Sequence, residues 1–293
     1  MSKIIYRNVS LYFRDKASVF FSLLSVLIVM LLYILFLSNV QVVSITEQIG
    51  ATANKNNISY LINTWILAGI LSITTVTSTL GALAFMVNDR ENKIIKDFKS
   101  SPITNSTYPV AGVISSFIVG LTMSIIALLI YGVYIFIDTG YLFSLIIIVE
   151  TLALIVVSTI MNAALMGLLV SFISTNNVYS SASLIIGTTI GFVNGLYIPI
   201  GELPDKIQTF IKLLPFAHIA SMFRQILMKD SIPKTFDGAP VEAINTYKEI
   251  FGIILKWKNE SIAFNISLIF VIAVFTISII LFFINFRRKR EEI

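Results

Sequence analysis

The feature that most constrains this chain is the length of its uncharged segments. The longest, Thr151–Gly201, runs for 51 residues without Asp, Glu, Lys or Arg. As one helix it would measure roughly 75 Å, whereas the hydrocarbon core of a bilayer is about 30 Å thick. The segment therefore has to fold back on itself, and its polar run Ser174–Asn177 is the expected turn.

Four other uncharged segments are each long enough for one membrane crossing, which takes about 20 apolar residues. They lie at 17–46, 56–88, 100–137 and 261–286. Charged residues make up only 13% of the chain, about half the share usual in soluble proteins. We therefore predict an all-α membrane protein, a single transmembrane domain over 1–293. Its six spans lie near 18–38, 62–86, 109–137, 142–173, 179–198 and 262–285, with an external hairpin and insertion at 199–260.

Basic residues predict the orientation of these spans. They gather before the first span, after the second and behind the sixth, whereas the short loop 39–59 contains only Lys55. Since Lys and Arg are enriched in cytoplasmic loops, both termini are expected in the cytoplasm. The basic residues in question are Lys3, Arg7, Arg14, Lys16, Arg90, Lys93, Lys96, Lys99 and Arg287–Arg290. The first span is read as a retained anchor.

Several kinds of site are excluded by composition and motifs. The chain has no cysteine and a single histidine, which excludes disulfides, Cys-zinc sites and His-cluster metal sites. It has no G-x-x-x-x-G-K-[ST] phosphate loop and no H-E-x-x-H or G-x-S-x-G motif. We therefore expect no enzyme activity, no cofactor or metal in this chain, and no nucleic-acid partner.

The N-terminal segment 3–17 is predicted to be an amphipathic helix on the membrane surface. Ile5, Val9, Tyr12 and Phe13 share one face of it, and the basic residues share the other. It is either a plain anchor in the lipid headgroups or an elbow that also touches a partner. The candidate residues of this interface helix are Lys3, Arg7, Tyr12, Phe13 and Arg14.

The loop 88–99 (NDRENKIIKDFK) is predicted to be a short cytoplasmic helix, in which Asp89–Lys93 and Lys93–Asp97 form i,i+4 pairs. Its apolar stripe favours docking to a partner protein, because connectors have little reason to expose such a stripe. The alternative is a solvated connector whose apolar face rests on its own bundle. The candidate coupling residues are Arg90, Glu91, Ile94, Ile95 and Phe98.

Three glycines four residues apart, Gly187, Gly191 and Gly195, lie on one face of the predicted fifth span. Glycines at this spacing let another helix approach closely. The neighbour is either a second copy of the chain at a dimer seam or another helix of the same chain, and the sequence favours neither.

Prolines divide the segment after the fifth span into two short helices, too short to cross the membrane. Such a segment fits a re-entrant hairpin or lid on the outer face, provided its backbone is packed in protein. The lone histidine here is more often a hydrogen-bonded structural residue than a switch. The candidate gate residues are Pro199, Pro204, Phe210, Pro215 and His218.

Glu150 is the only ionisable residue within a predicted span. A carboxylate in the membrane is costly, so a proton or cation site is one interpretation. The other is a structural residue near the outer surface that is satisfied by a neighbour.

Three stretches resemble the permease subunits of ABC-2 type ABC exporters: Leu11–Tyr33, Asn88–Thr104 and Gly195–Leu227. The last carries a Pro … Leu-Pro … Leu-Pro … His … Arg signature and is the most specific of the three. The resemblance implies a bacterial plasma-membrane complex of two permeases, identical or different, and two ABC ATPases that bind ATP and Mg. It makes 88–99 the coupling helix, places the first and fifth spans at the seam and makes 199–223 the outer gate. The insertion 228–258 departs from the shortest family members.

The expected function is the permease part of an ATP-driven exporter. The apolar interior suits an amphipathic drug, toxin, lipid-like compound or peptide, as in multidrug efflux or toxin export. One alternative is a polysaccharide or lipid-linked glycan exporter of the same fold. Another is a proton-coupled secondary transporter that uses Glu150. A lipid-acting membrane enzyme is disfavoured because the chain lacks clustered acid–base groups.

Overall fold

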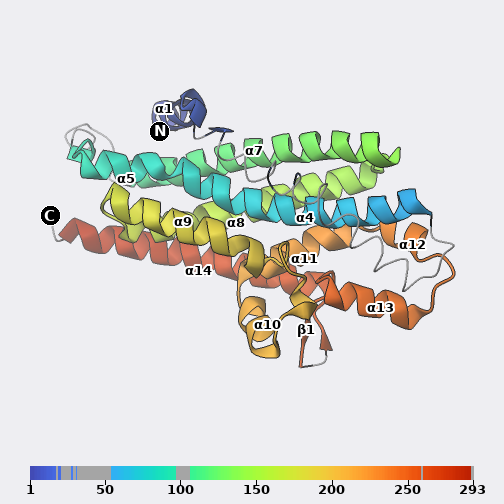
Figure 1. Cartoon of the computed structure of the whole chain (residues 1–293). Helices are drawn as coiled ribbons and strands as arrows, with labels where there is room; N and C mark the ends of the chain where they lie inside the picture. The colour runs from blue at the N-terminus through green and yellow to red at the C-terminus, as the bar shows by residue number, and fades with distance from the viewer. Residues whose placement is uncertain are drawn as a thin grey trace.

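The structure is a computed structural model of the chain, in which long helices run antiparallel to one another (Figure 1). It describes residues 1–17, 19–20, 28, 31, 54–96, 106–258 and 260–291, with side chains up to Asn285. The predicted first span, 18–38, lies almost entirely outside these residues.

Four helices of the described residues are long and apolar enough to cross a membrane, and they match the predicted second, third, fourth and sixth spans. The uncharged segments therefore identified these four helices correctly. They are α4 (Lys55–Ala82), which continues into α5 (Ala84–Glu91), α7 (Thr107–Thr139), α8 (Leu145–Phe172) and α14 (Phe264–Glu291).

Helix α9 (Asn176–Val193) replaces the predicted fifth span, 179–198, and is not among those four. It begins and ends earlier than predicted. Gly195 adopts a positive φ of 69°, and Leu196 N–H donates to the Asn194 side chain at 3.2 Å, so the chain turns at this point. A glycine tolerates this left-handed conformation at no steric cost, and the helix ends there.

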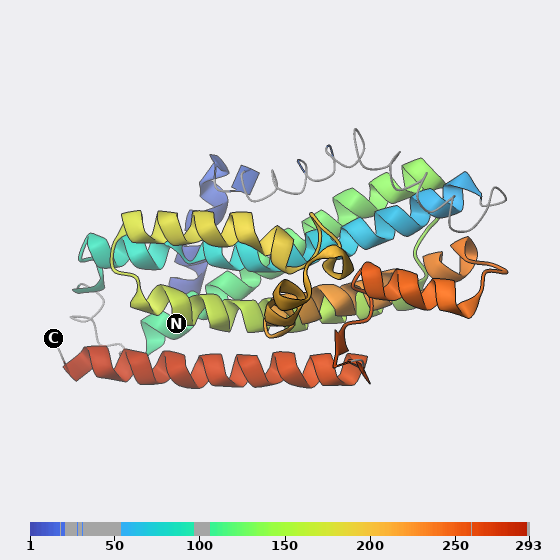
Figure 2. The ribbon, with the colours of Figure 1, turned by 60° about the horizontal axis from the view of Figure 1, so that its bottom comes forward.

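The two ends of the bundle differ in structure. Helix α5, the start of α7 and the end of α14 lie at one end, which we call the α5 end; α1 (Ser2–Arg14) packs beside it (Figures 1 and 2). Short elements lie between α9 and α14 in the sequence. These are η2 (Ile200–Glu202), α10 (Asp205–Lys212), α11 (Pro215–Leu227), α12 (Ser231–Thr235), α13 (Val241–Ile250) and the antiparallel pair β1 (Lys256–Trp257) and β2 (Glu260–Ser261). Helices α12 and α13 reach the opposite end, the α12 end, whereas α10 and β1 lie beside the middle of the bundle (Figures 1 and 2).

Both prolines predicted to divide this region do so. Pro204 is the residue before α10, and Pro215 is the first residue of α11, where a missing N–H costs nothing. The apolar residues of α11 at helical spacing are buried: Ile219, Met222, Phe223 and Ile226. In α10 only Ile211 is buried, and Ile207 and Phe210 are exposed.

Helix α4 is the central element, because α7, α8, α9, α11 and α12 all pack against it. Its buried hydroxyls mostly bond to its own backbone: Thr74 donates to the Ile70 carbonyl and Thr79 to the Thr75 carbonyl, both at 2.8 Å. Such bonds satisfy polar groups where lipid offers none. Side-chain amides also bond between helices: Asn162 Nδ2 of α8 donates to Thr75 Oγ1 of α4 at 3.0 Å.

Close packing at Gly120 holds α4, α7 and α8 together. A Cβ at this position would lie 2.6 Å from Thr79 Cγ2 and 2.7 Å from Thr159 Cγ2. Replacing Gly120 with Leu should therefore cost about 1–3 kcal/mol by overpacking and lower the melting temperature of the purified protein. Gly132→Leu, on the same helix but with no neighbouring atom within 4 Å, is the control. Equal melting temperatures for the two variants would contradict this packing.

Candidate functional site

A buried carboxylate at the α5 end joins three helices. Asp89, on α5, is 1% exposed and accepts two hydrogen bonds from the Arg7 guanidinium, at 2.8 and 2.9 Å. It also accepts one from the Tyr108 hydroxyl at 2.7 Å. The hydrogen bonds that Arg7 donates to Asp89 raise the pKa of Arg7 above its ordinary value. Two-pronged arginine–carboxylate bonds are strong and directional, so α1 is held in one position against α5 and α7.

The packed face of α1 overlaps the predicted apolar face. Of the predicted residues, Tyr12 is buried, Ile5 and Val9 are partly buried and pack on the core, and Phe13 is exposed. The packed face also includes Ile4 and Asn8, which are buried. Asn8 Nδ2 donates to Ser115 Oγ on α7 at 3.4 Å, so polar contacts contribute to this packing. Of the predicted basic residues, Lys3 and Arg14 are exposed and Arg7 is bound to Asp89.

The two residues after Asp89 fasten the α8–α9 turn. Arg90 Nη1 donates to the carbonyls of Val170, at 3.2 Å, and Ile173, at the end of α8. Glu91 accepts from the backbone N–H of Asn176, the first residue of α9, at 3.0 Å. A cation at a helix C-terminus and an anion at a helix N-terminus are each favoured by the helix dipole. These two candidate coupling residues therefore contact their own chain.

The helix predicted over 88–99 ends at Glu91, and its expected Asp89–Lys93 pair is replaced by the Asp89–Arg7 pair. Lys93 has a φ of 61°, which breaks the helix. Beyond it Ile94 and Ile95 are both partly buried, and Ile95 packs on the main core. Phe98, the remaining member of the predicted stripe, lies outside the described residues.

Replacing Asp89 with Asn should weaken the attachment of α1. An Asn side chain replaces one acceptor oxygen with an NH2 group, which cannot accept the hydrogen bonds that Arg7 and Tyr108 donate. The expected cost is about 1–3 kcal/mol, typical of hydrogen bonds to a charged group. A cysteine placed at the buried Ile4 should then react faster with a thiol reagent. Asp237→Asn, an exposed carboxylate at the α12 end, is the control, and an unchanged rate in Asp89→Asn would contradict the role of Asp89.

The predicted glycine stripe is divided between three environments. Gly187 faces open space, with no atom within 4 Å of an added Cβ. Gly191 is covered by the ring of Tyr197 of the same chain, which would lie 2.2 Å from such a Cβ. Gly195 lies beyond the end of α9. The three residues therefore do not form one continuous face of a helix.

Arg224, on α11, is the functional candidate that the sequence reasoning missed. It is 0% exposed and donates to the carbonyls of Asn194 at 2.8 Å, Gly195 at 3.0 Å and Gly252 at 3.4 Å. Its guanidinium carbon lies 5.0 Å from the ring centre of Trp65 on α4. Arg224 thus joins the end of α9, the central helix α4 and the part of the insertion 228–258 that follows α13. The available signal was an arginine at the end of the proline-rich signature.

The insertion 228–258 is packed onto the bundle through the same cluster. Trp65 Nε1 donates to the Phe251 carbonyl at 2.8 Å, and Ser221 donates to the Ile253 carbonyl at 2.8 Å. Tyr247 stacks on Phe251 and is buried. The insertion is therefore part of the folded domain rather than a loose loop.

His218, 4% exposed and on α11, joins this helix of the predicted gate to α10 and to α14. Its Nε2 lies 2.9 Å from the Lys212 carbonyl of α10, to which it donates, and its Nδ1 lies 3.0 Å from Ser267 Oγ of α14. Burial lowers the pKa of His218, so the ring is neutral near pH 7. The remaining gate residues differ in exposure: Pro199 and Pro215 are buried, Pro204 is exposed, and Phe210 is 61% exposed.

Acidification should destabilise the protein through His218. Because the unfolded state binds a proton near pH 6.5 and the folded state does so only at lower pH, stability falls as the pH drops through about 6.5. The slope is at most about 1.4 kcal/mol per pH unit. Melting temperatures between pH 7.5 and 5.5 should fall less in His218→Gln, and since the chain has no other histidine the difference isolates this group. Parallel curves would contradict a neutral buried ring.

Glu150 pairs with Lys229, at the junction of α11 and α12. Both side chains are partly exposed, 36% for Glu150 and 47% for Lys229. An exposed ion pair is worth about 0–1 kcal/mol and needs no further function. The contact favours the structural interpretation of Glu150.

Four apolar helices, a carboxylate-centred cluster at one end and a packed cap at the other define a polytopic membrane transport component. Residues 36–284 match the family described as ABC-2 family transporter protein, so the chain belongs to this family. It is accordingly the permease part of an ABC transporter, a membrane component without its own ATPase site. No curated protein matches the chain significantly.

Proposed function

We propose that this permease belongs to an exporter that uses ATP to move amphipathic compounds, such as drugs, toxins, lipid-like molecules or peptides, out of the cell. Two ABC ATPases would bind the α5 end from the cytoplasm and carry the ATP and Mg. A second permease, identical or different, would complete the pathway through the bilayer. The observation that carries the proposal is the family match over 36–284, together with the contacts of segment 88–96.

The contacts of this segment support a coupling role. Asp89 holds α1 and α7, Arg90 holds the end of α8, and Glu91 holds the start of α9. A displacement of α5 by a partner would therefore reach four helices through short, charge-assisted hydrogen bonds. Ile94, just beyond these residues and partly exposed, is the described side chain best placed to contact the ATPase.

The exposed face of α9 supports a contact with a second permease. It presents Leu184, Ile185 and Phe192 together with Thr188, and the open space at Gly187 allows close approach of another helix. Gly191 and Gly195 are occupied by their own chain, so the proposed seam is centred on residues 180–188 rather than on the three glycines.

The lining of the bundle supports an amphipathic cargo. Between 56 and 88, and between 107 and 137, the chain has no charged residue, and the buried polar side chains of these two ranges are hydroxyls and the amide of Asn63. Such a surface suits apolar and hydrogen-bonding molecules better than a bare ion. A glycan exporter of the same fold is the alternative cargo class. The exposed Glu150–Lys229 pair disfavours the proton-coupled rival.

The test uses the tagged chain purified from its native membranes, with Ile94 replaced by Glu. The wild-type chain should co-purify with a nucleotide hydrolysis activity that vanadate inhibits. Ile94→Glu should reduce this co-purified activity at least about tenfold, because it would bury a new charge at the contact with the ATPase. The control is Val241→Glu, a change of the same type at an exposed residue of α13.

Transport in inverted vesicles distinguishes the proposal from its rival. ATP should drive accumulation of an amphipathic dye, and a proton gradient alone should not. Transport by the isolated chain with a proton gradient, or full hydrolysis with Ile94→Glu, would overturn the proposal.

A further inference from the structure

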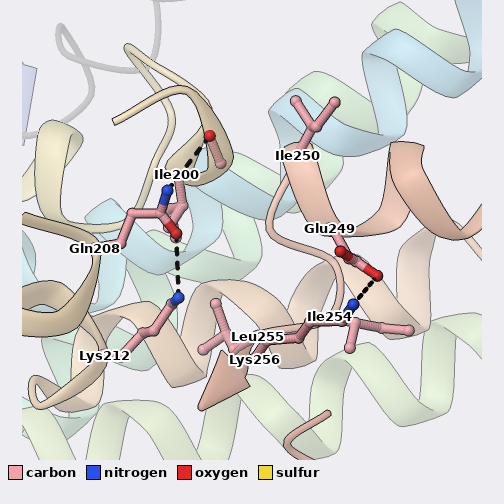
Figure 3. Close-up of a pocket in the computed structure, with 9 residues that line it drawn as sticks. Ile200, Gln208, Lys212, Glu249, Ile250, Ile254, Leu255 and Lys256 are labelled. Atoms are coloured by element: carbon pink, nitrogen blue, oxygen red, sulfur yellow. Dashed lines mark hydrogen bonds and ion pairs between the residues drawn. The ribbon is translucent and has the colours of Figure 1, made fainter. Parts of the chain in front are cut away.

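An open pocket of about 210 Å³ lies between η2, α10 and the segment from α13 to β1. Ile200, Ile250, Ile254 and Leu255 give it an apolar lining. Its polar side chains stand on two opposite walls: Gln208 and Lys212 on one, and Glu249 with Lys256 on the other (Figure 3). The pocket is distinct from the Asp89 cluster and from the exposed face of α9.

The two lysines differ in their partners. Lys256 forms an ion pair with Glu249, so its charge is balanced. The Lys212 ammonium donates to the neutral Gln208 Oε1 at 3.1 Å, and none of the ion pairs formed by the described residues includes it. Burial lowers the pKa of Lys212, opposed by Asp205 two turns earlier on α10. The pocket therefore offers one uncompensated positive charge beside an apolar wall.

Lys212 is held in place from both sides. Gln208 Nε2 donates to the Leu203 carbonyl at 2.8 Å and to the Gly201 carbonyl at 3.4 Å, which fixes the amide oxygen that faces Lys212. The Lys212 carbonyl accepts a hydrogen bond from His218 at 2.9 Å. An ordered ammonium costs less to bind than one that has to be immobilised by the ligand.

We propose that this pocket binds a singly charged carboxylate that carries a short branched apolar group. The carboxylate would bind Lys212, and the apolar group would pack on Ile200, Ile254 and Leu255. The volume is below that of pockets that enclose a whole drug-sized ligand, so it suits one amino-acid-sized unit. The same chemistry is found at the carboxyl end of an apolar peptide and in a short branched fatty acid. Binding needs neither ATP nor a partner ATPase, so the inference is independent of the proposed function.

The experiment measures protection from thiol labelling in the full chain, purified in lipid nanodiscs. The protein has no cysteine, so Ile254→Cys provides a single reporter in the pocket. N-acetyl-leucine should slow its labelling with half-protection at about millimolar concentration, the range expected for so small a ligand. N-acetyl-leucinamide, which lacks the carboxylate, should protect at least about tenfold less well. A cysteine at Val241, outside the pocket, should not be protected.

Variants of Lys212 test its role. Lys212→Gln should raise the half-protection concentration at least about tenfold, and Lys212→Arg, which keeps the charge, should restore binding to within about threefold. Lys206→Gln, at an exposed lysine of α10 that does not line the pocket, is the matched control and should change nothing. Saturation-transfer NMR on the cysteine-free chain repeats the comparison with Ile254 intact.

Two acids distinguish the source of the ligand. Tighter binding of N-acetyl-leucine than of 4-methylpentanoate assigns the pocket to peptide ends, and equal binding assigns it to branched acids in general; both support the carboxylate site. Equal protection by the amide, protection unaffected by Lys212→Gln, or no protection at about 50 mM would overturn it.

Discussion

The arrangement of this bundle depends on how its helix ends are satisfied. The last carbonyls of a helix have no partner within the helix, and lipid supplies none. Two arginines provide the donors, one at the α5 end and one beside the middle of α4. Arg90 binds the carbonyls that end α8, and Arg224 binds the carbonyls of Asn194 and Gly195 that follow α9. Because each arginine belongs to a different helix from the one it binds, the same bonds that satisfy the backbone also fix which helices are neighbours.

The two clusters differ in how they connect the helices. At the α5 end, consecutive charged residues of one short segment contact α1, the start of α7, the end of α8 and the start of α9, so the segment is a common attachment point. In the other cluster, Arg224, Trp65 and His218 join elements that are far apart in the sequence, and the insertion 228–258 is packed over Arg224 and Trp65. The first cluster therefore depends on one shared segment, and the second on several separate contacts.

The sequence predicted the elements whose formation depends on local properties of consecutive residues. Runs without charge located four spanning helices, and Pro204 and Pro215 located the starts of α10 and α11, because hydropathy and proline geometry act locally. The errors arose where tertiary contacts decide. Asp89 pairs with Arg7 rather than with Lys93, α5 ends before the left-handed Lys93, and α9 ends at Asn194 and Gly195. The environment of Arg224 was not predictable, since its carbonyl partners lie about thirty residues away on either side.

The early end of α9 has a consequence for the surrounding lipid. Eighteen residues span roughly 27 Å, whereas the hydrocarbon layer measures about 30 Å. A membrane adapts to such a deficit by thinning beside the short helix or by recruiting another protein surface to cover the gap, at a cost of a fraction of a kcal/mol per Å. Under the proposed contact between two permeases, a second α9 would cover its exposed face, and bilayer thickness would become one of the forces that favour the pairing.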